Sequence, residues 1–233
     1  MELHGKVSVV TGAGSGVGWF VAERLRTAGA TVIAVDVVRD DGITEADVAS
    51  ESGRATVVRA AEAAGGADVL VNNAGGWSTG GAQYPDADPA RWRAAMDLDL
   101  LAPMGLLQML LSGLRDGHGA VVNVASSAGV ETTAYGSPEY AAAKAGLIRF
   151  TTSVADWRER YGVRVNCVVP GWVGLERAHN ELLVMSAHER ATMPALVPPE
   201  LIADQVVRLL RDDSLAGRVV TMLDGDLEPV LLQ

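Results

Sequence analysis

The sequence predicts an α/β fold: a doubly wound parallel sheet of about seven strands with helices on both faces. Two observations predict it. Short runs rich in β-branched residues alternate with longer runs of helical spacing along almost the whole chain, and glycine or proline stands at most junctions. Parallel strands need a crossover between them, so this alternation gives a parallel sheet, and right-handed crossovers give a Rossmann-like order.

The expected strands are short and mostly apolar, and the expected helices are longer. The strands cover Lys6–Val10, Thr31–Val35, Ile43–Val48, Ala67–Val71, Ala120–Ala125, Val163–Val169 and Arg218–Leu223. The helices cover Val17–Thr27, Arg54–Ala64, Pro89–Arg115, Pro138–Tyr161 and Pro199–Arg211. The residues between Asp36 and Ile43 are too few for a crossover helix, which needs about a dozen. We therefore expect the second crossover helix to be absent or shortened to a turn around Arg39–Gly42.

Composition favours one domain and argues against several classes of partner. The 233 residues, 48% of them hydrophobic, suit a single domain, 1–233, with a large core. The formal net charge is −10 and no cluster of lysine and arginine is present, which argues against a nucleic-acid partner. The most apolar stretch, Leu98–Leu114, is interrupted by Asp99 and Pro103, so we expect no membrane span.

Cysteine usage and the first residues bear on the compartment. Cys167 is the one cysteine, so an intrachain disulfide is impossible. The chain starts without a charged-then-apolar leader pattern and runs into a strand. A reducing cytoplasm is therefore the expected location. His118, His179 and His188 lack metal-ligand spacing with acids or cysteine, so we expect no metal site.

A glycine-rich turn, Thr11–Gly18, joins the first strand to the first helix. Glycines there permit a tight turn and let backbone N–H groups approach a pyrophosphate, to which the helix N-terminus adds a favourable dipole. The alternative is a loop that only needs positive φ angles. Because the turn stands between a strand and a helix, as dinucleotide sites require, we interpret it as a phosphate-binding turn.

Asp36 ends the second strand and indicates which dinucleotide is bound. A carboxylate there can accept hydrogen bonds from both ribose hydroxyls of NAD and repels the 2′-phosphate of NADP. Ser15 and Val37 are not basic, and Arg39 is the nearby candidate for receiving that phosphate. The alternative is a solvated aspartate at a strand end. We expect NAD as the cofactor.

Further segments follow in order and resemble, over nearly the whole chain, the single-domain type of the short-chain dehydrogenase/reductase family. The matching segments are Thr11–Gly18 (TGxxxGxG), Asp47–Val48, Asn72–Gly75 (NNAG), Asn123–Ser126, Tyr140–Lys144 (YxxxK) and Pro170–Gly171. Each is loose alone, but six in order at suitable spacing are specific. The resemblance implies NAD-dependent hydride transfer between a nicotinamide and a secondary alcohol or ketone. It also implies a homotetramer or homodimer formed through the two long helices.

The resemblance assigns the residues of the site. Those that would hold the cofactor are Gly12, Ser15, Gly16, Val17, Gly18, Asp36, Asp47, Val48, Asn73, Gly75, Tyr140, Lys144, Pro170, Gly171 and Val173. The catalytic residues would be Ser126, Tyr140, Lys144 and Asp99. At Leu175 the family often has a threonine, so one hydroxyl contact to the cofactor is missing; backbone groups near Val173 can still bind the carboxamide.

At the position of Asp99 the family usually has an asparagine, which helps to position a water in the proton path from the lysine. An aspartate can keep that water as an acceptor but cannot donate as an amide does. We expect Asp99 to approach Lys144 through the water and to shift the pH optimum. The alternative is that Asp99 caps or pairs elsewhere and backbone carbonyls hold the water.

The chemistry follows from the residue types. Tyr140 and Lys144 lie four apart on an expected helix and so share a face. A free tyrosine has a pKa of about 10 and is a poor base at neutral pH. A nearby ammonium favours the phenolate and makes acid–base catalysis efficient nearer neutral pH. Ser126 would donate a hydrogen bond to the substrate oxygen, with Ser127 as the neighbouring alternative. A surface Tyr–Lys pair and a serine cap remain the structural alternatives.

Two tryptophans and one long connection are candidates for the substrate side. Trp77 and Trp172 follow turns at expected carboxyl ends of strands, where they either line a pocket or pack. Residues 173–198 form a long substrate-loop insertion, and its leucines and methionines either cover a hydrophobic substrate or pack two short helices onto the body.

Two other functions compete with the oxidoreductase. A non-catalytic NAD-binding sensor or scaffold could use the same fold. Retention of Ser126, Tyr140 and Lys144 argues against it, although Asp99 keeps it open. A sugar-nucleotide epimerase would be longer and would carry an added substrate domain. The expected partner is a small alcohol or carbonyl compound.

Overall fold

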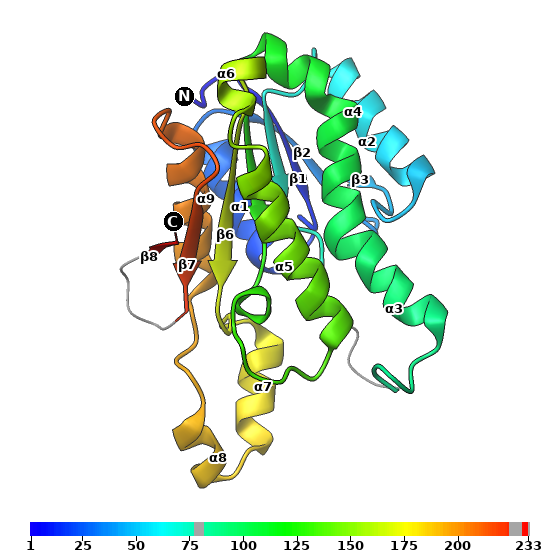
Figure 1. Ribbon diagram of the computed structural model, residues 1–233. Coiled ribbons are helices and arrows are strands. Elements are labelled where there is room, and N and C mark those ends of the chain that lie inside the picture. Colours follow the sequence, from blue (N-terminus) through cyan, green and yellow to red (C-terminus); the bar gives the residue numbers. More distant parts are fainter. Residues whose placement is uncertain (77–81, 224–229, 233) are drawn as a thin grey trace.

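Figure 1 shows one sheet with helices packed on both faces; the structure, a computed structural model, describes residues 1–76, 82–223 and 230–232. In this part of the chain the strand order is β3-β2-β1-β4-β5-β6-β7-β8. The parallel strands are β1 (Val7–Thr11), β2 (Thr31–Asp36), β3 (Ile43–Glu45), β4 (Val69–Asn72), β5 (Ala120–Val124), β6 (Arg164–Pro170) and β7 (Val219–Met222). The order reverses between β1 and β4, which is where ligands bind in such folds.

The helices form two layers around this sheet. One face carries α1 (Gly16–Thr27) and α9 (Pro199–Arg211). The other carries α2 (Glu51–Ala63), α4 (Ala102–Asp116) and α5 (Pro138–Ser153). The shorter helices are α3 (Pro89–Met96), α6 (Trp157–Tyr161), α7 (Glu176–Val184) and α8 (Ala187–Thr192), with a π-helical turn at Asp97–Leu101 and a 3₁₀ turn at Ser127–Gly129. Helices α7 and α8 extend beyond the carboxyl end of β6 (Figure 1).

Alternate strand residues supply the two cores, because successive side chains of a strand point to opposite faces. Val10 and Val71 pack with α1 and α9, whereas Val9 and Leu70 pack with α2 and α4. All four side chains are fully buried. A sheet covered on both faces explains why the strands read as continuous apolar runs.

The predicted fold class is confirmed. The sheet is doubly wound and parallel, and residues 37–42 pass from β2 to β3 without a helix, as their small number required. The prediction missed β8 (Val230–Leu232), which pairs antiparallel with β7. A strand of three residues at a sheet edge is too short to give a periodic pattern.

The helix expected over Pro138–Tyr161 is broken into α5 and α6. At the end of α5 the hydroxyl of Thr151 donates to the carbonyl of Leu147, and those of Thr152 and Ser153 donate to the carbonyl of Arg149. Such side-chain bonds compete with the backbone and end a helix.

The stretch expected as one helix over Pro89–Arg115 contains the π-helical turn Asp97–Leu101. Contrary to the expectation from the sequence, Asp99 and Pro103 do not interrupt the helical stretch. By length and composition only, Pro89–Asp116 is long and apolar enough to cross a membrane, because an 18-residue window within it has a mean hydropathy of 1.4. The core helix of a globular protein meets the same measures, and α4 buries its Leu106, Leu107 and Leu114.

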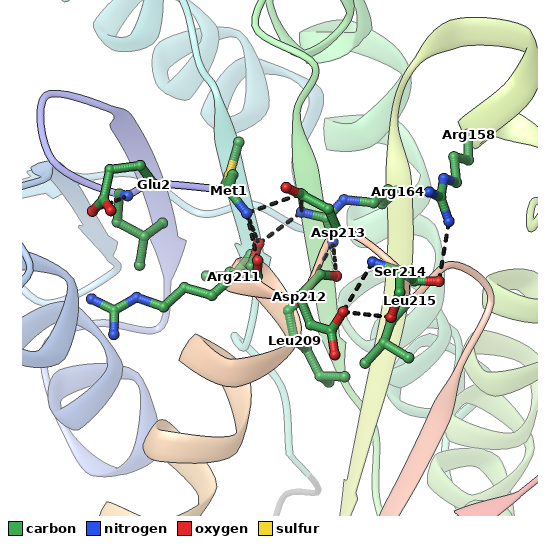
Figure 2. A network of polar contacts seen from close by, with 12 residues as sticks. Met1, Glu2, Arg158, Arg164, Leu209, Arg211, Asp212, Asp213, Ser214 and Leu215 are labelled. Carbon is green, nitrogen blue, oxygen red and sulfur yellow. Dashed lines mark hydrogen bonds and ion pairs between the residues drawn. The ribbon is translucent and has the colours of Figure 1, made fainter.

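At the amino ends of the strands, Arg164 ties β6 to the last turn of α9 (Figure 2). Its guanidinium donates to the carbonyls of Leu209, Leu210 and Asp212 at 2.7–3.1 Å and pairs with Asp213 at 3.0 Å. The carbonyls at a helix C-terminus have no partners within the helix and carry its negative partial charge. Arg164 therefore holds this edge of the sheet together.

Candidate active site

The glycine-rich turn leaves no room for side chains. Gly12 has a φ of +64°, and a Cβ there would lie 2.9 Å from the Cα of Ala74. A Cβ on Gly18 would collide with the carbonyl of Gly12, so α1 begins directly against the turn. Gly14 and Gly16 complete this cradle, the second with a φ of +56°. The turn thus presents bare backbone to whatever binds above it.

The turns after β1 and β4 are bonded to each other. The hydroxyl of Thr11 accepts from the N–H groups of Asn73 and Ala74, each at 3.0 Å. The side-chain amide of Asn73 donates to the carbonyls of Thr11 and Gly12 at 3.0 and 3.1 Å. These bonds lie where the strand order reverses, so Asn73 holds together the two turns beside which ligands bind in such folds.

Asp36 lies beside the glycine-rich turn. One of its carboxylate oxygens accepts from the N–H of Gly14 at 2.9 Å and the other from the N–H of Val38 at 3.2 Å. Arg39 points to an acid instead, with 4.0 Å between its Nε and a carboxylate oxygen of Glu45. Asp36 therefore brings a carboxylate to the rim of the cradle, and the nearest arginine has an acidic partner.

Asp47 and Val48 follow β3 at the same edge of the sheet. The carboxylate of Asp47 accepts from the N–H of Ala49 at 3.0 Å and is exposed, whereas Val48 is buried. Ser50 then caps α2 by accepting from the N–H of Gly53. The predicted pair thus lies in a tight turn with its polar member facing outward.

Ser126 follows β5. It is the N-cap of the 3₁₀ turn Ser127–Gly129, and its hydroxyl accepts from the N–H of Ala128 at 3.3 Å. Ser127, the alternative, is the first residue of that turn, and both serines are half-buried. The hydroxyl proton of Ser126 stays available for donation, because this bond uses only an oxygen lone pair.

Tyr140 and Lys144 lie one turn apart on α5, as their spacing predicted. The ammonium nitrogen of Lys144 is 5.6 Å from the centre of the Tyr140 ring and donates to the carbonyl of Val124 at 3.0 Å. Lys144 is 3% exposed, so its charge is nearly shielded from water. Ser126 follows Val124 by two positions, so this bond brings the ammonium of Lys144 to the segment that carries Ser126.

Asp99 is fully buried and pairs directly with Lys144. Its Oδ1 lies 3.2 Å from the ammonium nitrogen and accepts from the N–H of Gly76 at 2.9 Å. Burial raises the pKa of the Asp99 carboxyl above its usual value, while the charge of Lys144 opposes that rise. The prediction that Asp99 would reach Lys144 through a water is corrected: the π-helical turn carries the carboxylate far enough inward for contact.

The turn after β6 and the segment 173–198 lie across from these residues. Gly171 donates its N–H to the carbonyl of Met222, and a Cβ on it would strike Leu223. Val173 forms a bridge with Val197. Leu175 lies against Gly16, with 3.2 Å between its Cδ1 and the position of a Cβ there. An apolar side chain thus covers the place where the family often has a hydroxyl.

The long segment holds α7 and α8 rather than an extended loop. Trp172, just before it, is half-buried and gives its carbonyl to the N–H of Val197. Trp77 lies outside the described residues. Leu183 and Val184 of α7 are exposed, at 76% and 87%, so this apolar face is not packed onto the body.

Several contributors to the site escaped sequence reasoning. The N–H of Gly76 and the carbonyl of Val124 bind through the backbone and leave no trace in residue type. Tyr135 stacks on Tyr140 with 6.1 Å between ring centres, although four residues lie between them and no helical spacing links them. Thr11 was visible as the first residue of the turn, but its bridging hydroxyl was not.

Comparisons with known proteins agree with this geometry. A family model described as short chain dehydrogenase matches residues 6–182. The chain belongs to the short-chain dehydrogenase/reductase family. It is 31% identical to the 3-oxoacyl-(acyl-carrier-protein) reductase FabG of Thermotoga maritima over 97% of this chain and 99% of that one. It is 36% identical to the cis-4-hydroxycyclohexanecarboxylate dehydrogenase of Sinomonas cyclohexanicum over 89% and 90%.

Solved structures of the family share the fold. L-sorbose reductase from Gluconobacter frateurii, complexed with NADPH and L-sorbose, superposes with a TM-score of 0.86 at 27% identity, over 99% of this chain and 100% of that one. The short-chain dehydrogenase/reductase family comprises oxidoreductases that bind a nicotinamide cofactor. The bare cradle around Gly12 and Gly18 fits the phosphates of such a cofactor.

Proposed function

We propose that this protein transfers a hydride between NAD(H) and a secondary alcohol or ketone, with Tyr140 as the general acid and base. The observation that carries the proposal is the placement of Lys144. Its ammonium lies 5.6 Å from the Tyr140 ring and beside the Gly75–Gly76 turn, at the edge of the sheet that holds the glycine cradle. In this proposal proton transfer and cofactor binding share the carboxyl ends of the strands.

The residues of the site have distinct tasks in this proposal. Tyr140 gives its phenol proton to the carbonyl oxygen during reduction and removes the hydroxyl proton during oxidation. Lys144 favours the phenolate and, with Gly75, would hold the nicotinamide ribose. Ser126 donates a hydrogen bond to the substrate oxygen, where negative charge develops. A bound nicotinamide supplies or accepts the hydride.

The test uses purified protein, a panel of ketones, 3-oxoacyl thioesters and cyclic hydroxy acids, and NADH fluorescence. Tyr140→Phe should lower turnover by about 10²–10⁴-fold while NADH binding stays within about threefold, because the ring remains and the proton is lost. Tyr84→Phe, the same change on an exposed tyrosine, is the control and should keep full activity. Near wild-type turnover in Tyr140→Phe defeats the mechanism, and NADH binding without turnover on any substrate favours the sensor instead.

The preference for NAD over NADP is part of the proposal. The carboxylate of Asp36 at the cradle rim can accept from a ribose diol and repels a phosphate, and the arginine nearest to it faces Glu45. Asp36→Ser with Val37→Arg should narrow or reverse the ratio of NADH to NADPH affinity. Asp41→Ser, a charge removal in the exposed loop after β2, should leave the ratio unchanged. Equal affinity of the wild type for both cofactors contradicts the preference.

We also propose a homodimer or homotetramer through the long helices. Leu101, Met104 and Met109 expose 49%, 36% and 40% of their surface along the stretch that ends in α4. Apolar side chains of this size gain stability when a second copy covers them. Light scattering after size exclusion should give two or four times the chain mass, and Met104→Glu should lower it. A wild-type monomer at micromolar concentration contradicts the proposal.

A further inference from the structure

The buried pair of Asp99 and Lys144 does more than hold two elements together. Both side chains are almost out of contact with water, at 0% and 3% exposed, and 3.2 Å separates the carboxylate from the ammonium. A Cβ on Gly75 would lie 2.9 Å from the ammonium and would collide with Asp99 Oδ1. The pair therefore sits directly beneath the turn that faces the cofactor.

The charged and titratable groups around the pair and around Tyr140 come from several elements, and Tyr135, on the segment before α5, stacks on the Tyr140 ring. From α5, Lys144 and Tyr140 face the pair; from β6, the thiol of Cys167 lies in the field of Lys144. The turn after β4 contributes the N–H of Gly76 and no charge. Asp97, on the same π-helical turn as Asp99, is exposed. Asp99 is thus the negative charge that the described structure places against Lys144.

A carboxylate beside the ammonium changes what Tyr140 experiences. A lone ammonium near a phenol favours loss of the phenol proton. A carboxylate in contact with that ammonium opposes the effect, because the phenol then faces a charge pair whose net charge is zero. An amide at the same position would leave the ammonium charge unopposed.

We propose that Asp99 is a positioning residue that balances the charge of Lys144 and so holds the proton of Tyr140 to higher pH than an amide at position 99 would. The inference rests on the proposed function. Its consequence is that the protonated form, which reduces carbonyls, persists further into the alkaline range. Asp99 also fixes the ammonium at its distance from the ring, because its Oδ1 is anchored by Gly76.

Asp99→Asn is a close test because it preserves shape. The amide oxygen can accept from Gly76 and Lys144, as Oδ1 does, and the amide nitrogen takes the place of Oδ2, a buried oxygen without a hydrogen-bond partner among the described residues. The substitution removes the charge and replaces the acceptor Oδ2 by an amide donor. A unit charge within about 10 Å at an effective dielectric near 20 shifts a proton equilibrium by about one pH unit.

The experiment measures kcat against pH in both directions on a substrate from the panel. In wild type, kcat for alcohol oxidation should rise with pH and kcat for carbonyl reduction should fall. In Asp99→Asn the midpoints of both changes should lie about one pH unit lower. Maximal rates should stay within about tenfold. Asp97→Asn, the same charge change on the exposed neighbour, should leave both profiles in place. Asp99→Ser, also neutral and with an oxygen acceptor, serves where Asp99→Asn does not bind NADH.

The outcomes separate this inference from the proposed function. Unmoved profiles in Asp99→Asn, or a displacement toward alkaline pH, overturn the charge-balancing role while Tyr140→Phe still reports on the mechanism. An equal displacement in Asp97→Asn also overturns it, because a surface charge would then suffice. Full activity in Tyr140→Phe removes the proposed function and this inference with it.

Discussion

Two cations are buried at opposite edges of the sheet, and they are bound differently. Arg164, 4% exposed at the amino ends of the strands, gives its donors to three carbonyls at the end of α9 and pairs with Asp213, whose side chain is 70% exposed (Figure 2). Lys144, 3% exposed at the carboxyl ends, has one carbonyl and the fully buried Asp99 as partners among the described residues.

The two arrangements differ in the free energy that is lost when the cation and its partners are buried. Carbonyls at a helix end need donors in any case, and the carboxylate of Asp213 remains solvated. The contacts of Arg164 therefore stabilise the fold without burying a second charge. Burying Asp99 removes a second charge from water and leaves one of its oxygens without a described partner. A sequence keeps such an arrangement where it serves chemistry rather than stability. The comparison supports a structural role for the edge with Arg164 and agrees with the proposed catalytic role of the edge with Lys144.

The largest effect is expected from removing the buried cation at the carboxyl ends of the strands. Lys144→Met should lower turnover by about 10³-fold or more, since it removes both the charge beside Tyr140 and the proposed contact to the cofactor ribose. The fold should survive, because Asp99 can take up a proton once its partner is gone. Turnover is measured with NADH in excess, and folding by circular dichroism. A variant that keeps a tenth of wild-type turnover places the catalytic cation elsewhere.

The structural edge should respond in the opposite way. Arg164→Met removes the guanidinium donor from three carbonyls, of which that of Leu209 has no other donor among the described residues, and should lower the free energy of unfolding by about 2–4 kcal/mol. Turnover per folded molecule should stay within about twofold, because the site lies at the other end of the strands. Urea unfolding and active-site titration measure the two quantities. Loss of activity without loss of stability would reverse the assignment of the two edges.

A smaller effect is expected from crowding the functional edge without touching a charge. Gly75→Ala pushes a methyl group into Asp99 and Lys144 and should lower turnover about 10–100-fold. Gly136→Ala, before α5, meets no atom within 4 Å and serves as the matched control. Both variants are compared by kcat and by thermal unfolding. Equal activity of the two would show that the pair tolerates displacement.

The contrast also explains what the sequence could reveal. The glycine-rich turn and the Tyr140–Lys144 spacing are local patterns, in which neighbours along the chain are neighbours in space, and they were predictable. Asp36 lies 22 positions from Gly14 and was predicted from its place at the end of the second strand. The strand order followed from short connections and right-handed crossovers. Asp99 was visible as a departure from its family, yet nothing local indicated direct contact with Lys144. That contact depends on a π-helical turn packing against α5.

Backbone contributions were equally out of reach. The N–H of Gly14 that binds Asp36, and the carbonyl of Val124 that receives Lys144, could belong to any residue type. Arg164 raised no expectation either, because a helix end that needs donors is identified only once the helix has a place in the fold. The residue types of a sequence indicate which chemistry a site can perform. The backbone groups that bind those side chains are determined by tertiary packing and cannot be identified from residue types.

The smallest effect concerns the pH dependence of stability at Asp99. Burial raises the pKa of this carboxyl, so the folded chain binds that proton more tightly than the unfolded chain, whose aspartates titrate near pH 4. The resulting stabilisation is complete below about pH 4 and is lost as the pH rises through the folded value. Asparagine does not titrate. The free energy of unfolding of wild type minus that of Asp99→Asn should therefore increase as the pH is lowered from 8 toward 4. Urea unfolding of both proteins at each pH measures it, and the subtraction cancels the other carboxylates. A difference that is constant, or that shrinks toward acid, means that Lys144 outweighs burial in setting the charge of Asp99.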